Sequence, residues 1–351
     1  MKRIPLVECC EILDSQRIPI TAKDREEGPY PYYGANGVQD YVADYIFDDD
    51  LVLLAEDGGN FGSKERPIAY RVSGKCWVNN HAHVLKPAAE TDVDYLCYAL
   101  MFYDTSGLVN GATRQKLTQA AMRQMTIPLN SIEDQRIIVR KIKAVEQIKK
   151  QRKTQLEALD ELIKARFVEM FGDAVVNPMG WPTKELQDLV TDDCKISYGI
   201  VQTGDDQEEG VPVFRPVDIV NHVPVRSELK RTTEEISNKY KRTILKGREL
   251  LITVRANIAD TYIIDREFAG CNVGRGIVPI RTNEDVMVLE FLKHQLDSKH
   301  LNDDIKAMAK GITLIQLNME DLRTVKLIVP PIEQQKAFVS FAKHVDKSKL
   351  S

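Results

Sequence analysis

Residues 111–142, GATRQKLTQAAMRQMTIPLNSIEDQRIIVRKI, have a second version in the same chain at residues 311–342, GITLIQLNMEDLRTVKLIVPPIEQQKAFVSFA. The two stretches align without a gap at a constant spacing of 200 residues. The identical pairs include Gly111/Gly311, Thr113/Thr313, Leu117/Leu317, Arg123/Arg323, Ile132/Ile332, Glu133/Glu333, Gln135/Gln335, Val139/Val339 and Val145/Val345. Self-similarity at a fixed spacing is typical of a duplicated structural unit. We therefore predict two copies of one domain, each followed by the start of a helix.

The similarity continues upstream more weakly and with small shifts. EGPYPYYG from Glu27 resembles EGVPVFRP from Glu209, and WVNNHAHVLKP from Trp77 lies roughly opposite GCNVGRGIVPI from Gly270. Apolar runs that end in a Gly- or Asn-containing turn predict buried strands. These runs are LVLLAEDGG from Leu51 and ELLITVRAN from Glu249. Segments of helical periodicity follow in each copy, so both copies are predicted to be mixed α/β globules.

A long helix is predicted between the copies, because residues 133–170 contain neither Gly nor Pro. Its seam residues follow the 4-3 spacing of a heptad repeat, which calls for a partner helix. At 1.5 Å per residue the helix is about 55 Å long, and Gly172 is its natural C-terminal cap. The second copy begins the same helix at Glu333 and the sequence reaches Ser351, so the second helix is expected to be about half as long.

Charge and cysteine usage narrow the class of protein. The net charge of −4 argues against indiscriminate nucleic-acid binding, because a DNA reader normally has a basic footprint. If DNA is the ligand, basic residues must be locally concentrated or a partner must supply phosphate contacts. The six cysteines form no C-x-x-C pair, so neither a zinc site nor a disulfide framework is indicated. Reduced thiols in cytoplasm are expected, and no stretch approaches the ~20 apolar residues of a membrane span.

Motifs in both copies resemble the specificity subunit of type I restriction–modification systems. They are IPLNSIEDQ at 127–135, IVPPIEQQ at 328–335, Gly-x-Thr at 111–113 and 311–313, YYGANG at 32–37, and FGD at 171–173 followed by GWP at 180–182. The family's usual turn is close to I-P-L-P-P-L-x-E-Q, from which Asn130 and Ser131 depart. The short second helix is another departure. The resemblance covers nearly the whole chain.

The resemblance implies two target-recognition domains held apart by an antiparallel pair of helices. The expected fold class is thus mixed α/β, with two duplicated α/β domains joined by long helices that form an antiparallel coiled coil. The expected segments are residues 1–132 (first domain), 133–172 (central helix), 173–332 (second domain) and 333–351 (second helix). The implied ligand is double-stranded DNA, read as a bipartite asymmetric site. Methyltransferase subunits would dock on the helices and restriction subunits outside them, and these partners would bind the methyl donor and ATP, so no cofactor is expected here.

Base reading needs Arg, Lys, Asn and Gln on loops beside the major groove. The candidates in the first copy are Lys64, Arg66, Asn79, Asn80, His81, Arg114, Gln115 and Lys116. The candidates in the second copy are Arg255, Asn257, Asn272, Arg275, Lys310, Thr313 and Gln316. Any one of them could instead be a solvated loop side chain, so the prediction rests on the cluster in each copy.

Catalytic and metal-binding patterns are weak in this chain. His81 and His83 form an H-x-H pair without an equivalent in the second copy or a cysteine nearby. Asp218, Glu228 and Lys230 match a D-x9-E-x-K nuclease pattern that is common by chance. The sequence has no Gly-rich cofactor loop with an N-P-P-Y-like motif. We therefore expect neither a metal site nor catalysis.

Two rival functions stay open at this point. A detached specificity half of a combined restriction–methylation enzyme would carry cofactor motifs, which are missing here. A coiled-coil adaptor with two globular heads would bind no DNA, and a mobility assay with the methyltransferase present would separate it from a specificity subunit.

The short second helix should leave part of the central helix without a partner. Ile138, Ile142 and Val145 are expected to form an exposed apolar stripe there. Exposed stripes of this kind usually mark a binding surface. We predict that a second copy of this chain or a methyltransferase subunit covers it.

Overall fold

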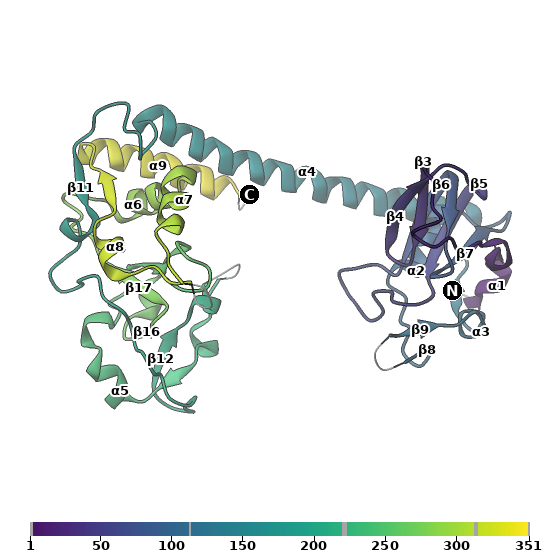
Figure 1. Ribbon diagram of the computed structural model, residues 1–351, viewed down its shortest axis with the longest axis horizontal. Coiled ribbons are helices and arrows are strands. Elements are labelled where there is room, and N and C mark those ends of the chain that lie inside the picture. Colours follow the sequence, from purple (N-terminus) through teal and green to yellow (C-terminus); the bar gives the residue numbers. More distant parts are fainter. Residues whose placement is uncertain (1–2, 112–113, 220–222, 312–314, 350–351) are drawn as a thin grey trace. The chain divides into compact units, whose positions relative to one another are not determined.

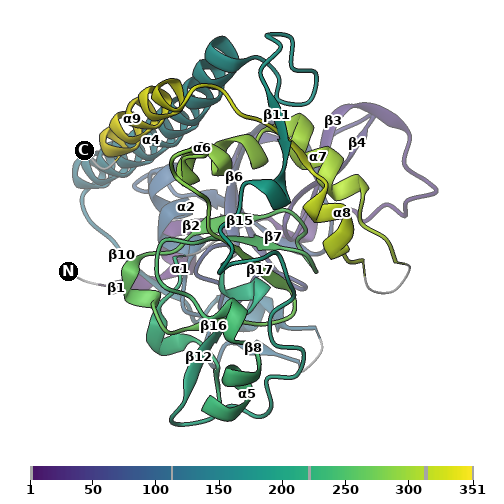
Figure 2. The same cartoon turned by 90° about the vertical axis from the view of Figure 1, so that its left-hand side faces the viewer.

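The computed structural model describes residues 3–111, 114–219, 223–311 and 315–349. The chain divides into two compact units, which we call unit 1 (Met1–Arg152) and unit 2 (Lys153–Ser351). Figure 1 labels many of the helices and strands of both units, and Figure 2 shows the same cartoon from a second direction. Within the described ranges no helix is long and apolar enough to cross a membrane.

Unit 1 is built on a six-stranded sheet with the order β2-β7-β5-β6-β3-β4. Its strands are β2 (Cys10–Ile12), β3 (Glu27–Gly34), β4 (Gly37–Val42), β5 (Phe47–Ala55), β6 (Ala69–Val78) and β7 (Ala82–Pro87). Neighbours are antiparallel except β3 and β6, which run parallel. Val52 and Leu54 pack into one hydrophobic cluster and Leu51 and Leu53 into another. Both faces of β5 are therefore covered, which explains its unbroken apolar run.

Short elements complete unit 1. They are α1 (Leu6–Cys9), η1 (Asp14–Gln16), α2 (Val93–Met101), α3 (Gln119–Met122), and the antiparallel pairs β1 (Arg3–Pro5) with β10 (Thr126–Pro128) and β8 (Val109–Asn110) with β9 (Lys116–Leu117). The side chain of Asp92 accepts hydrogen bonds from the amides of Asp94 and Tyr95. This N-cap fixes where α2 begins.

Unit 2 repeats the central strands of unit 1 in a less continuous form. β14 (Leu250–Thr253) lies between β15 (Thr261–Ile263) and β17 (Ile277–Ile280), as β5 lies between β6 and β7. β12 (Val211–Phe214) runs parallel to β16 (Asn272–Val273), as β3 runs parallel to β6. The counterpart of β6 is thus split into β15 and β16, with the short turn η6 (Arg266–Phe268) between them.

The remaining elements of unit 2 surround these strands. They are β11 (Thr183–Glu185), η2 (Leu186–Asp188), η3 (Pro216–Asp218), η4 (Arg226–Glu228), β13 (Arg231–Thr232), α5 (Glu234–Lys239), η5 (Lys241–Thr243), α6 (Leu289–Leu296), α7 (Lys299–Ala307), α8 (Met319–Arg323) and β18 (Lys326–Ile328). β11 pairs with β18 just as β1 pairs with β10 in unit 1.

Two helices continue from the repeated turns. α4 (Ile132–Phe171) is one helix of 40 residues, in agreement with the helix predicted over 133–170. It ends at Gly172, which has a φ of 75° and donates its amide to the carbonyl of Val168 at 2.8 Å. α9 (Ile332–Ser348) packs on α4 within unit 2. The rings of Phe338 and Phe171 lie 5.8 Å apart, and Lys349 Nζ lies 2.6 Å from Asp160, so the two helices are antiparallel.

A repeated glutamine fixes the start of both helices. Gln135 Oε1 accepts a hydrogen bond from the amide of Asp92 at 2.8 Å, and Gln335 Oε1 accepts one from the amide of Val288 at 2.9 Å. Both glutamines are completely buried. Since a buried amide needs its hydrogen bonds, α4 is tied to the start of α2 in the same way as α9 is tied to the start of α6.

Candidate nucleic-acid interface

In unit 1, predicted base-reading side chains gather where β5 ends. Arg114 Nη2 lies 2.6 Å from Asp57 Oδ1, and His81 Nδ1 lies 2.7 Å from the same oxygen. Lys116 Nζ lies 3.1 Å from Glu56 Oε1. The side chains of Arg114 and Lys116 are 60% and 48% exposed. Two carboxylates therefore hold a surface cluster of cationic and imidazole donors.

The other candidates of unit 1 are placed differently. The exposed loop residues among them are Lys64, Arg66, Asn80 and Gln115. The prediction for Asn79 has to be corrected, because this residue is buried. Its side chain donates to Gln39 Oε1 at 2.9 Å and accepts from the amide of His81 at 2.8 Å. Asn79 shapes the turn that carries His81, since leaving these groups unpaired would be unfavourable.

In unit 2, the segment after β14 carries a chain of polar contacts. Arg255 Nε donates to Gln316 Oε1 at 2.5 Å, and Gln316 Nε2 donates to the hydroxyl of Tyr198. The guanidinium carbon of Arg275 lies 5.8 Å from the centre of the Tyr198 ring. All four side chains are half-buried. Tyr198 was not among the sequence candidates, because nothing in its local sequence connects it with Gln316, 118 positions away.

The prediction for Asn272 also has to be corrected. This residue lies in β16 and is completely buried. Its Nδ2 donates to Ser237 Oγ at 2.9 Å, and its Oδ1 accepts from Thr243 Oγ1 at 2.6 Å. Asn257 is an exposed loop residue, whereas Thr313 lies outside the described residues.

The two units place different charges at one equivalent position. An isolated antiparallel bridge joins Asp57 to Lys116 in unit 1 and Arg255 to Gln316 in unit 2. A carboxylate in unit 1 thus stands where unit 2 has a guanidinium, and a lysine stands where unit 2 has an amide. Lys310 exchanges two backbone hydrogen bonds of 3.0 Å with Gln316 and adds another cation to this surface of unit 2. The duplicated frame therefore carries two chemically distinct polar surfaces.

A buried ion cluster lies next to the surface cluster of unit 1. Among the described residues, Asp14, Glu56 and His83 offer ligand atoms within 4.8 Å of one another, as a metal site would require. However, the guanidinium of Arg17 already contacts Glu56 at 2.7 Å and Asp14 at 3.5 Å. The two histidines of the H-x-H pattern also contact different carboxylates. Ion pairs with Arg17 and Lys116 therefore balance the charges of these carboxylates.

The hydrogen bonds in this cluster determine its protonation. Burial alone would raise the pKa of Asp14, but the hydrogen bond and charge of His83, the Val84 amide and Arg17 outweigh it, so the pKa lies below its usual value. His83 Nδ1 is 2.6 Å from this carboxylate, and Nε2 is 2.9 Å from the carbonyl oxygen of Leu117. A carboxylate and a carbonyl only accept hydrogen bonds. Each ring nitrogen of His83 therefore faces an acceptor, and the buried ring is held on both sides.

Both parts of the chain match the same protein family. Residues 1–158 and residues 178–351 match the type I restriction modification DNA specificity domain. The chain belongs to this family. The match of both parts of the chain confirms the family that the turn motifs resemble and agrees with the duplication expected from the repeat.

Relatives with similar sequences are specificity subunits of type I restriction enzymes. A candidate type I restriction enzyme specificity subunit of Haemophilus influenzae is 27% identical over 342 residues, which is 96% of this chain and 85% of that protein. The EcoBI type I restriction enzyme specificity subunit of Escherichia coli is 23% identical over 253 residues. That match covers 66% of this chain and 53% of the EcoBI subunit, so the chain spans about half the length of this second relative.

Solved structures share the fold of this family member. The S subunit of a type I restriction–modification system from M. genitalium has a TM-score of 0.56 at 11% identity, over 99% of this chain and 90% of that chain. A chain from a structural study of complex assembly and conformational transition of the type I R-M system has a TM-score of 0.59 at 16% identity, with the same two coverages. The expected fold class of duplicated α/β domains and antiparallel long helices is confirmed.

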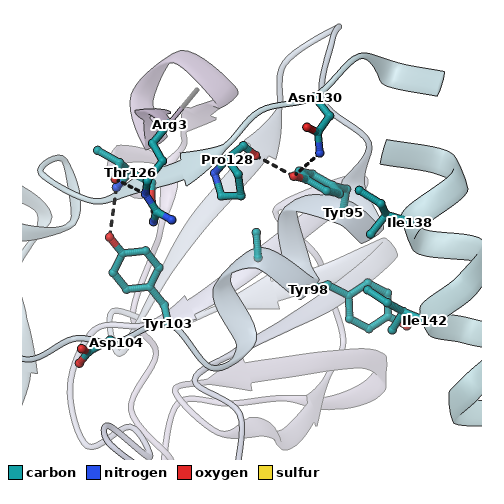
Figure 3. A pocket seen from close by; sticks show the side chains of 11 residues that line it. Arg3, Tyr95, Tyr98, Tyr103, Asp104, Thr126, Pro128, Asn130, Ile138 and Ile142 are labelled. Carbon is teal, nitrogen blue, oxygen red and sulfur yellow. Dashed lines mark hydrogen bonds between the residues drawn. The ribbon is translucent and has the colours of Figure 1, made fainter. Parts of the chain in front are cut away.

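In this family member the apolar stripe expected on α4 is only partly exposed. Ile138 and Ile142 are half-buried and line a groove of about 760 Å³ together with Tyr95 and Tyr98 of α2 (Figure 3). Val145 is 57% exposed. The expectation of a fully exposed stripe is therefore corrected, because two of its three residues face a neighbouring helix of their own unit.

The corresponding place in unit 2 is filled by aromatic rings. Phe167 and Phe171 of α4 pack on Phe291 of α6 and Phe338 of α9, with ring centroids 4.9 to 5.8 Å apart. α6 and α9 are the counterparts of α2 and the first turns of α4, as their buried glutamine contacts show. Unit 1 thus has a groove where unit 2 has packed phenylalanines.

Proposed function

We propose that this chain is a non-catalytic subunit that reads double-stranded DNA as a bipartite, asymmetric site. The observation that carries the proposal is the surface cluster of donors at the same bridge in both units. Arg114 and Lys116 supply it in unit 1, and Arg255 and Arg275 supply it in unit 2. Arginine and lysine are the side chains that most often read guanine in the major groove. Membership of the DNA specificity domain family supports the same ligand.

The two half-sites are proposed to differ in sequence. Asp57 and Arg255 occupy the equivalent position of the two units. A carboxylate accepts a hydrogen bond from the amino group of cytosine, whereas a guanidinium donates to O6 and N7 of guanine. The duplicated frame would present each unit to its half-site in the same way, and the different side chains would select different bases.

Tight DNA binding is proposed to need partner subunits. The chain has a net charge of −4, so it can release few counterions from DNA by itself. Its relatives are specificity subunits of type I restriction enzymes. We therefore propose that the chain positions methyltransferase subunits over the site, with restriction subunits outside them. Those partners would bind the methyl donor and ATP.

Replacing Arg255 with glutamine should relax the guanine preference of one half-site by about 1–3 kcal/mol, the value of a bidentate contact. The other half-site should keep its preference. The measurement is selection from a pool of duplexes randomised in both half-sites, with the full chain assembled with its methyltransferase subunits.

The matched control for this experiment is Arg248→Gln. It removes the same charge near the opposite end of β14, where Arg248 pairs with Glu284 and Glu290. The control should leave both half-site preferences unchanged. Equal losses at the two half-sites, or no loss with Arg255→Gln, would contradict the assignment.

The net charge of −4 favours one alternative function, a coiled-coil adaptor that binds no DNA. A mobility assay with the methyltransferase present separates the two functions. The specificity subunit should produce a sequence-dependent and salt-sensitive complex. The adaptor should leave the mobility of the duplex as it is with the methyltransferase alone.

A helix of another chain is also proposed to cover the groove of unit 1 and the apolar residues next to it. Val145 and Ile148 of α4 are 57% and 62% exposed. Exposed apolar surface of this kind usually marks an interface, and unit 2 covers the equivalent place with phenylalanines. The occupant would be a methyltransferase subunit or, in its absence, a second copy of this chain.

A triple variant in which Ile138, Ile142 and Val145 are each replaced by serine should no longer self-associate. Light scattering of the purified chain measures this. Because Ile138 and Ile142 are half-buried, the double replacement Val145→Ser and Ile148→Ser tests the same surface with less risk to folding. It should also weaken association, since each buried aliphatic side chain contributes roughly 1.5–3 kcal/mol.

The matched control replaces two apolar residues on the later turns of α4 with serine. These residues are Leu162 and Val168, which are 47% and 57% exposed. This control should associate like the parent chain. The proposed interface is wrong if the Val145 and Ile148 double variant also associates like the parent.

A further inference from the structure

We infer that Gln316 and Tyr198 are positioning residues that hold the guanidinium of Arg255 in the orientation needed to read a guanine. This inference rests on the proposed function and assigns specific roles within unit 2. Gln316 was expected to contact a base itself. The geometry gives it a different role, because both ends of its amide are already in use.

The orientation of the Gln316 amide follows from its two neighbours. Arg255 Nε can only donate a hydrogen bond, so the atom 2.5 Å from it must be the amide oxygen of Gln316. The amide nitrogen then faces the hydroxyl of Tyr198 and donates to it. A flipped amide would place the donors Arg255 Nε and Gln316 Nε2 against each other, so the arginine fixes which end of Gln316 faces it, and the Tyr198 hydroxyl accepts a hydrogen bond from the other end.

The contact leaves the reading edge of Arg255 available. A guanidinium has five N–H donors in one plane, and Gln316 uses the single donor on Nε. The two Nη groups keep the pair of donors that match O6 and N7 of guanine. A hydrogen bond on Nε restricts rotation of the plane, so less side-chain freedom is lost when DNA binds.

The backbone around the three residues is held on several sides. The amide of Leu317 donates to the carbonyl of Val254 at 2.9 Å, next to the bridge between Arg255 and Gln316. Beside Tyr198, a Cβ on Gly199 would come within 2.2 Å of the carbonyl oxygen of Val273, so this position requires glycine. The polar chain therefore links two anchored segments.

The turn after Arg255 has an unfavourable backbone conformation. Ala256 and Ala259 have φ values of 60° and 65°. The left-handed region is unfavourable for a non-glycine residue, because Cβ comes too close to the following carbonyl oxygen. The turn is held by Thr253, whose carbonyl accepts from the Ala259 amide at 2.9 Å and whose Oγ1 accepts from the Asp260 amide at 3.0 Å. Conformations of this kind persist where surrounding contacts enforce them and are frequent at functional sites.

Unit 1 lacks this arrangement at the equivalent bridge. Asp57 replaces Arg255 and Lys116 replaces Gln316. In unit 1 the carboxylate holds Arg114 and His81, whereas in unit 2 the amide holds the arginine. Loss of the positioning contact should therefore affect only the half-site read by unit 2.

Tyr198→Phe tests the inference because it removes one hydroxyl and keeps the ring that packs against the core of unit 2. With the full chain and its methyltransferase subunits, the guanine preference that depends on Arg255 should fall about two- to tenfold, the effect of one lost hydrogen bond. Gln316→Leu should reduce it at least as much. The slope of binding affinity against salt concentration should stay unchanged in both variants. Only the loss of a phosphate contact would lower this slope, and a positioning residue makes no such contact.

A double-mutant cycle distinguishes positioning from direct contact. In an Arg255→Gln background, Tyr198→Phe should have no further effect on base preference. An additional loss there would overturn the inference, since Tyr198 would then contact DNA itself. Unchanged preference in Tyr198→Phe and Gln316→Leu, with a loss in Arg255→Gln, would also overturn it while leaving the proposed function intact. If the parent complex shows no base preference in either half-site, the proposed function fails together with the inference.

Discussion

Replacing Phe171 with alanine is expected to lower the free energy of unfolding of unit 2 by about 3–5 kcal/mol, the usual loss for a buried phenylalanine. Phe171 is completely buried at the end of α4. Its ring centroid lies 4.9 Å from that of Phe291, 5.3 Å from that of Phe167 and 5.8 Å from that of Phe338. The smaller side chain would leave a cavity where α4, α6 and α9 meet, and the aromatic contacts would be lost with it.

The measurement is urea unfolding of the full chain, followed by the fluorescence of Trp181. The chain has two tryptophans, so a Trp77→Phe background assigns the signal to unit 2. Phe171→Leu is the matched control and should lose less, because it leaves a smaller cavity. Val168→Ala changes an exposed residue of the same helix and should have little effect. A loss for Phe171→Ala no greater than that for Val168→Ala would show that the helices are not held at this junction.

Replacing Asp14 with asparagine is expected to destabilise unit 1 by about 3–5 kcal/mol, as for a broken buried ion pair. Asp14 accepts from Nδ1 of His83 at 2.6 Å and from the amide of Val84 at 2.9 Å, and it contacts Arg17. The neutral amide would remove one counter-charge of Arg17 and would weaken the hydrogen bond to Nδ1 of His83. Because Glu56 beside it holds Lys116 at the surface, the variant should also loosen the donor cluster of unit 1.

The same contact predicts a pH dependence. The pKa of Asp14 is lower in the folded chain than in the unfolded chain, where an aspartate has a pKa of about 3.9. Its contribution to stability is therefore present above that value and is lost as the pH falls through the lower, folded-state pKa. The difference in stability between the parent and Asp14→Asn should thus narrow below about pH 4.

Urea unfolding in a Trp181→Phe background, followed by the fluorescence of Trp77, reports on unit 1. Asp104→Asn is the matched control, since Asp104 is an exposed carboxylate whose side chain bonds locally to the amide of Ser106. It should leave the unfolding midpoint nearly unchanged at neutral pH. Equal midpoints for Asp14→Asn and the parent would show that the charge of Asp14 does not stabilise unit 1.

The sequence alone determined the duplication, the class of fold and the extent of the central helix. A repeat at constant spacing keeps the same order of elements in both copies, so its meaning does not depend on long-range contacts. The helix over 133–170 was equally readable, because the absence of Gly and Pro and the cap at Gly172 are local properties. Candidate donors could also be chosen from local sequence, such as Arg255 from its place after a predicted strand and Arg114 from its place after Gly111.

Which candidate side chains reach the surface, and what each one contacts, depends on how distant segments of the chain pack together. Asn79 and Asn272 follow apolar runs like the exposed candidates, yet both are buried and bonded to residues far away in the sequence. Tyr198 meets Gln316 across 118 positions, which no local pattern encodes. The physical reason is that the direction of a side chain on a strand reverses with a shift of one residue, and a buried polar group is stable only where distant segments supply its hydrogen bonds.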